Sequence, residues 1–155
     1  MKKLFVMAAI LFLVACSGGM SGATTTTCTD APGVFTSGET VIIIEGYDEE
    51  IRLWTEQTTL TREQLKSYVL EGAHLTDDEI IDMFEFLNSL EIEGSELELV
   101  LLDEEEAIIE EISDYTIISN EALSDKWEVD DFEQEIVLSA VIRGLEGQDA
   151  VCDTE

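Results

Sequence analysis

The sequence predicts an α+β fold: a small antiparallel sheet with an inserted helical hairpin at about residues 61–90. Three observations support this class. The β-branched run TVIII at residues 40–44 is typical of a strand. Two later segments begin with the same helix-capping pattern, and residues 96–102 alternate like a strand, with acidic side chains at positions 96 and 98. Strands and helices that are segregated along the chain define the α+β class.

The first predicted strand, residues 40–44, ends near Gly46. Its expected hairpin partner is the weakly alternating segment IRLWT at residues 51–55, which follows an acidic turn at residues 47–50.

Two helices are predicted from a repeated start signal. Thr61 is followed three residues later by Gln64, and Thr76 is followed in the same way by Glu79. This spacing is that of a capping box, in which the two side chains satisfy backbone N–H groups at the helix start. A leucine before each threonine completes a hydrophobic staple.

The first helix is expected to run to about Glu71 and to stop at Gly72, and the second to run from Asp77 to about Leu90. Together they form the predicted hairpin. The second helix is expected to bury the apolar residues that recur at helical spacing, Ile80, Met83, Phe84, Leu87 and Leu90.

The segments after Gly94 are more ambiguous. Residues 96–102 alternate like a strand, although Ser95 followed by Glu98 also mimics a helix cap, and we favour the strand. Residues 107–112 and 115–118 are expected to form a second strand, turned around residues 103–106.

The last apolar run, residues 135–144, is compatible with a buried strand or with a helix that begins at Asp130. Periodicity alone does not separate these alternatives in a short run. We favour the strand.

The amino-terminal segment predicts export. Two lysines precede residues 4–15, which lack charged or polar side chains and are too short to span a bilayer, since a spanning helix needs about 20 residues. A positive start, a short apolar core and small residues at its end are the parts of a signal peptide. The alternative is a short core helix with an incidental cysteine.

The end of this run, LVACSGG at residues 13–19, is similar to the lipobox of bacterial lipoproteins. The resemblance covers residues 1–17 and implies cleavage before Cys16 and lipidation of its thiol. Two or more acyl chains anchor a protein stably. In a Gram-negative host, Ser17 implies sorting to the outer membrane.

These features divide the chain into three parts. Residues 1–15 are predicted to be the lipoprotein signal peptide, and residues 16–27, rich in Gly, Ser and Thr, a flexible tether. Residues 28–155 contain enough apolar material for one core and are predicted to form a single acidic globular domain.

If the thiol of Cys16 is lipidated, two of the three cysteines remain. Cys28 and Cys152 then remain in an oxidising compartment and are predicted to form a disulfide that joins the two ends of the domain. The alternative is two free thiols.

The charge of the chain is strongly negative. Its formal net charge is −29, and without Lys2 and Lys3 five basic side chains face 36 acidic ones, a net charge of −31. Such a field repels nucleic acid and anionic lipid, and favours basic proteins or divalent cations as partners. A saline habitat is the alternative cause of the acidity.

No candidate for catalysis emerges. His74 is the sole histidine, so a His-pair metal site is excluded and any triad depends on this side chain. Acidic pairs are too abundant to be informative. The acidic residues at i, i+4 and i+7 of the second helix, Asp78, Asp82 and Glu85, are interpreted as a solvated face.

Ligand-binding patterns are equally weak. The acidic segments 48–50, 103–106 and 130–131 lack the pattern of an EF-hand loop. The glycines do not form a phosphate-binding loop. Trp54 and Trp127 are interpreted as core residues rather than as a ligand platform.

We therefore expect a cell-envelope protein, attached to the membrane by its lipid, that lacks catalytic activity and cofactors and acts as an interaction or structural module. The alternatives are an inhibitor or immunity-type binder of a basic protein and a divalent-cation-binding module.

Overall fold

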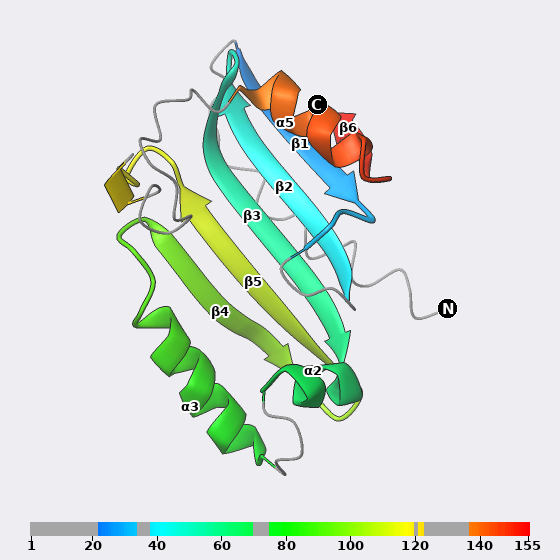
Figure 1. Ribbon diagram of the computed structural model, residues 1–155, viewed down its shortest axis with the longest axis vertical. Coiled ribbons are helices and arrows are strands. Elements are labelled where there is room, and N and C mark those ends of the chain that lie inside the picture. Colours follow the sequence, from blue (N-terminus) through cyan, green and yellow to red (C-terminus); the bar gives the residue numbers. More distant parts are fainter. Residues whose placement is uncertain (1–21, 34–37, 70–74, 120, 123–136) are drawn as a thin grey trace.

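A six-stranded antiparallel sheet forms the centre of the protein, with strand order β4-β5-β3-β2-β1-β6 (Figure 1). The computed structural model describes residues 22–33, 38–69, 75–119, 121–122 and 137–155. Its strands are β1 (Ala23–Thr29), β2 (Glu39–Tyr47), β3 (Glu50–Thr61), β4 (Ser95–Leu102), β5 (Glu106–Asp114) and β6 (Val151–Thr154); its helices are α2 (Arg62–Val69), α3 (Asp77–Asn88) and α5 (Leu138–Glu146). The predicted α+β class is confirmed.

The predicted hairpin of residues 40–44 and 51–55 is confirmed, and both strands are longer than expected. β2 and β3 pair from Glu39 with Thr59 to Tyr47 with Glu50. Ile42 and Ile44 are buried, while Val41 and Ile43 are partly exposed, so alternate side chains of β2 face the core.

Strand β1 corrects the predicted tether of residues 16–27, because residues 23–27 belong to this strand. β1 pairs with β2 on one side and with β6 on the other. Thr26 is completely buried, and its hydroxyl lies 2.8 Å from that of Thr154. Threonine is β-branched and favours strands. Pairing on both sides of β1 also offsets the conformational entropy that the segment loses on ordering, and its composition alone did not indicate this pairing.

The predicted disulfide between Cys28 and Cys152 is present. The two residues are direct partners in the pairing of β1 with β6, and Cys28 is completely buried. The bond therefore joins the two ends of the domain through neighbouring strands. β6 was not predicted, since its four residues carry little pattern of their own.

Both predicted helices follow β3 and begin with their predicted capping boxes. The Thr61 N–H donates to Gln64 Oε1 at 2.7 Å, and the Gln64 N–H donates to Thr61 Oγ1 at 3.2 Å. In α3 the Thr76 N–H donates to Glu79 Oε2 at 2.8 Å, and the Glu79 N–H donates to Thr76 Oγ1 at 3.4 Å. The hydrogen bonds from the Thr76 backbone and hydroxyl lower the pKa of Glu79.

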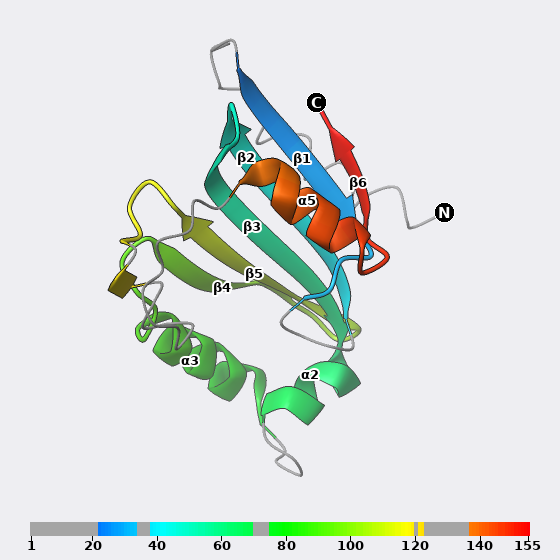
Figure 2. The ribbon, with the colours of Figure 1, turned by 45° about the horizontal axis from the view of Figure 1, so that its top comes forward.

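The helices pack chiefly on the sheet: α2 contacts β3 and β5, and α3 lies along β4 (Figures 1 and 2). An ion pair between Arg62 and Asp77 joins their first turns. The predicted end of the first helix, at Glu71 and Gly72, lies outside the described residues.

The predicted burial of the second helix is correct only in part. Ile80 and Phe84 are buried, but Leu87 is 36% exposed and Leu90 is 64% exposed. The helix ends at Asn88, before Leu90, and β4 is the edge strand. Leu87 lies in the last turn of the helix, and Leu90 lies beyond its end.

Helix α5 corrects the strand that we favoured for residues 135–144. Leu138, Val141, Ile142 and Leu145 pack into one core cluster at helical spacing. The first N–H groups of the helix find their acceptors on Glu49: Leu138 N donates to its backbone oxygen at 2.9 Å and Ser139 N to its carboxylate at 3.2 Å. A residue distant in the sequence thus caps this helix, so no local capping signal was visible.

Strands β4 and β5 confirm the two strands predicted after Gly94, with the turn at residues 103–106. The prediction that residues 115–118 continue the second strand is wrong. They form a turn in which the N–H groups of Ile117 and Ile118 donate to the Asp114 carbonyl at 3.0 Å.

Both core clusters lie on one face of the sheet. Cross-strand partners share a face, and Ile44 pairs with Trp54 at one end while Leu60 pairs with Ala107 at the other. α5 covers the first cluster, over β1 and β2, and α2 and α3 cover the second (Figure 2). Helix α3 is thereby placed beside the edge strand β4.

Candidate binding groove between helix α3 and strand β4

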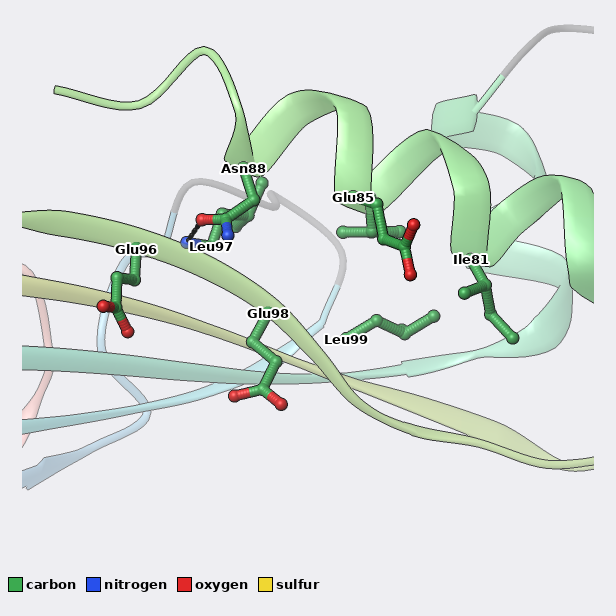
Figure 3. Close-up of a pocket in the computed structure, with 8 residues that line it drawn as sticks. Ile81, Glu85, Asn88, Glu96, Leu97, Glu98 and Leu99 are labelled. Atoms are coloured by element: carbon green, nitrogen blue, oxygen red, sulfur yellow. Dashed lines mark hydrogen bonds between the residues drawn. The ribbon is translucent and has the colours of Figure 1, made fainter.

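The helical side of the groove follows from the geometry of α3. Ile80 and Phe84 point to the sheet and are buried. The residue after each of them is turned by about 100° around the helix axis. Ile81 and Glu85 therefore lie toward the open edge of the sheet, where Ile81 is 42% exposed (Figure 3).

The strand side follows from the alternation of β4. Leu97 and Leu99 point toward α3 and pack against the core cluster, while Glu96 and Glu98 are exposed and point away from the helix (Figure 3). This period of two places an apolar row beneath the helix and an acidic row on the other face of the edge strand.

At one end of the groove, the side chain of Asn88 links helix α3 to strand β4 by a hydrogen bond. The Leu97 N–H donates to Asn88 Oδ1 at 2.8 Å (Figure 3). Because β4 is the edge strand, this bond satisfies a backbone donor that faces away from β5. A register shift between Leu99 and Leu101 interrupts the same strand. Both features hinder the addition of another strand at this edge.

The resulting groove has a volume of about 290 Å³. Its apolar lining is Ile81, Phe84, Leu97 and Leu99, and its polar lining is Glu85, Asn88, Glu96 and Glu98. Pockets for drug-sized ligands start at roughly 300 Å³. The groove therefore suits one elongated side chain better than a large organic ligand.

The electrostatics of the groove are dominated by carboxylates. Three of its eight lining residues are glutamates, and no ion pair between described residues involves them. The ion pair of Arg62 with Asp77 lies at the start of the helices instead. Of the three glutamates, Glu85 faces the groove, whereas Glu96 and Glu98 point to the other face of β4 (Figure 3). The net charge of −29 adds a negative field that attracts cations and repels anions.

The other residues singled out in the sequence do not converge on a site. Several of them lie outside the described residues: Cys16, His74, Trp127 and the acidic pair at residues 130–131. Trp54 packs, partly buried, against the first core cluster, as predicted.

The acidic candidates are dispersed. Asp78 and Asp82 are exposed on α3, as expected of a solvated face, whereas Glu85 lines the groove. Asp103 Oδ1 accepts hydrogen bonds from the N–H groups of Glu106 and Glu105, and these bonds lower the pKa of Asp103. Among the described residues, no group of three or more His, Cys, Asp or Glu is placed to hold a metal ion.

Sequence reasoning missed the groove, although one signal was present. Ile81 interrupts the polar face of α3 beside the buried Ile80 and Phe84. Apolar side chains outside the core stripe of an amphipathic helix indicate a second contact surface.

The architecture is an antiparallel sheet that carries helices on one face and a disulfide between its terminal strands. No protein-family model and no curated protein matches the chain. Among solved structures it is similar to the NMR structure of a protein from Streptococcus pneumoniae TIGR4, with a TM-score of 0.55 and 14% sequence identity over 88% of each chain. At this identity the similarity shows the fold.

Within the described part of the chain, no helix has the length and apolar character needed to cross a membrane.

Proposed function

We propose that this protein is a lipid-anchored protein of the cell envelope whose folded domain binds another protein and has no catalytic activity. The anchor is supported by the lipobox-like residues 13–16 and the apolar run before them. In a Gram-negative host, Ser17 favours the outer membrane.

The α3–β4 groove is the observation that supports a binding role. Apolar side chains line this groove: Ile81 is 42% exposed there, and Phe84, Leu97 and Leu99 complete the apolar lining. Exposed apolar side chains rimmed by charged ones are typical of protein interaction surfaces. A basic partner fits the acidity of the domain, and its association rate would fall with salt.

The anchor is tested by Cys16→Ser. We expect this variant to lose metabolic labelling with palmitate and to leave the membrane fraction, while Cys28→Ser retains both because its thiol lies in the folded domain. Retention of the label by Cys16→Ser would refute the anchor.

Binding is tested by cross-linking intact envelopes and recovering the lipidated protein at low and at high salt. We expect a discrete basic protein at low salt and less of it at high salt, because exposed charges are screened. Recovery of no protein at either salt would contradict the binding role.

A further inference from the structure

Helices α2, α3 and α5 all cover the same face of the sheet (Figure 2). Within the described residues they leave the opposite face, which we call the open face, without a helical layer. The strand register shows which side chains it carries, because cross-strand partners share a face. One row runs from Ile43 through Thr55 to Ile112. It ends at Glu96 on the edge strand β4, and Glu96 points away from α3 (Figure 3).

The centre of the open face is apolar. Its partly exposed aliphatic side chains come from the adjacent inner strands β2, β3 and β5: Val41, Ile43, Leu53, Ile108 and Ile112. They alternate with residues of the covered face, so residues 41–44 and 107–109 are apolar without interruption. Strands with one solvated face alternate between apolar and polar residues, whereas continuous apolar runs are typical of strands that are covered on both faces. These strands therefore match a sheet whose open face is covered by a partner.

Carboxylates surround this apolar centre. The exposed ones come from β2 and from the two edge strands: Glu39, Glu45, Glu96, Glu98 and Asp153. Glu110 also lies on this face and accepts a hydrogen bond from Gln57 Nε2 at 3.2 Å. The described basic side chains lie on the helices, except Arg52, whose guanidinium is 4.9 Å from the centre of the Tyr47 ring. The border of the open face is therefore negative.

The open face is large enough for a stable protein contact. The six strands, spaced by about 4.8 Å, extend over about 24 Å, and strands of nine residues such as β2 and β5 are about 30 Å long. The face therefore covers about 700 Å². Each partner contributes roughly 800 Å² to a standard protein interface.

Other occupants fit less well. A second copy of this chain would bring the same carboxylates together, and like charges that face each other destabilise a contact. Anionic lipid is repelled for the same reason. A small ligand would leave most of the apolar centre in contact with water.

We propose that the open face is the docking surface for a partner protein that presents an apolar patch surrounded by lysine and arginine side chains. The aliphatic side chains of the centre pack against the patch, and the carboxylates of the border pair with the cations. The inference rests on the proposed function and adds the surface and the chemistry of the contact.

The test is site-specific photo-cross-linking of the full-length lipidated protein in intact envelopes. The photoreactive residue p-benzoylphenylalanine replaces either Thr55, at the centre of the open face, or Phe86, which is 61% exposed on α3 and serves as the control. We expect a discrete cross-linked protein from position 55 and no product of the same mass from position 86. Mass spectrometry should identify a partner that is rich in lysine and arginine.

A first pair of variants, made in the protein with the photoreactive residue at position 55, tests the apolar centre. Ile43→Thr removes apolar surface from the open face and keeps a β-branched side chain. Ile81→Thr is its matched control, because Ile81 lies in the α3–β4 groove. We expect Ile43→Thr to lower the cross-linking yield about fourfold and Ile81→Thr to leave it within about 1.5-fold.

A second pair tests the charges. Glu39→Gln with Glu45→Gln removes two carboxylates from the open face, and Asp78→Asn with Asp82→Asn removes two exposed ones from α3. The net charge changes equally. We expect the first double variant to lower the yield about fourfold and the second to leave it within about 1.5-fold. Urea midpoints report whether each variant remains folded, and the exposed charge pair decides the test if Ile43→Thr lowers the midpoint.

Equal effects within the charge pair would overturn the inference, because they would show diffuse attraction to an acidic chain. A product from position 55 that contains only this chain would also overturn it, in favour of a second copy. If position 55 gives no product while chemical cross-linking recovers a basic protein, the inference fails and the proposed function stands. If neither method recovers a protein, both fail.

Discussion

Removal of the Cys28–Cys152 disulfide is expected to cost a third or more of the stability of the domain. The bond closes a loop with a sequence separation of 124 residues. In the chain-entropy model, a loop of this length restricts the unfolded chain by about 5 kcal/mol at 25 °C. Single domains have total unfolding free energies of about 5–15 kcal/mol, so the reduced protein should be marginally stable.

The assay is urea unfolding followed by tryptophan fluorescence, in a Cys16→Ser background so that only two cysteines contribute. We expect the double variant Cys28→Ala with Cys152→Ala to lose about 3–5 kcal/mol, and reductant to lower the stability of the background protein by a similar amount. Reductant should not affect the double variant, which is the control for nonspecific effects.

A loss below about 1 kcal/mol would refute this reasoning. It would mean that the unfolded chain already keeps its ends together, or that the pairing of β1 with β6 closes the domain without the bond.

Three further predictions concern local structure. Thr76→Ala should lower the unfolding free energy by about 1 kcal/mol in urea titrations, because it removes the capping box of α3; an unchanged midpoint would contradict the role of the cap. Gly94→Ala should lower the unfolding free energy by more than Thr76→Ala does, because Gly94 has φ +90° and an added Cβ would lie 2.8 Å from Ile118 Cγ1. An unchanged unfolding free energy would show that the turn adapts to the added methyl group. Asp103→Asn should destabilise the protein relative to Glu104→Gln at pH 7. Because hydrogen bonds lower the folded-state pKa of Asp103, its contribution is present above the unfolded pKa of about 4 and is lost as the pH falls through the folded value. The difference should therefore shrink in urea titrations as the pH is lowered below about 4; a difference that stays constant would assign the effect to something other than the charge.

Local signals predicted several elements well. The capping boxes at Thr61 and Thr76 are made by residues three positions apart, so their geometry depends little on the rest of the chain. The β2–β3 hairpin is similar, because adjacent strands pair across a short turn.

Predictions failed where a distant segment supplied the decisive contact. α5 receives its cap from Glu49, which lies 90 residues earlier than Ser139. Residues 23–27 form a strand because they pair with β2, and Thr26 and Thr27 also pair with β6, although their composition is that of a linker. Leu87 and Leu90 stay exposed because Leu87 lies in the last turn of α3 and Leu90 lies after the helix end at Asn88.

The candidate groove also depends on a contact between segments that are distant in the sequence. Glu85 was noted as part of a solvated face, but only the packing of α3 along β4 brings it beside Leu97 and Leu99. Periodicity assigns a side chain to a face of its own element and does not indicate which element lies opposite.

By itself, the sequence determined the α+β class, the starts of two helices, the pairing of Cys28 with Cys152 and the excess of negative charge. These properties depend on composition or on neighbours a few residues apart. Only the tertiary structure decided that residues 138–146 are helical, that β1 is an inner strand and that a groove lies between α3 and β4. The reason is that each of these features depends on contacts between segments far apart in the chain, which local propensity does not encode.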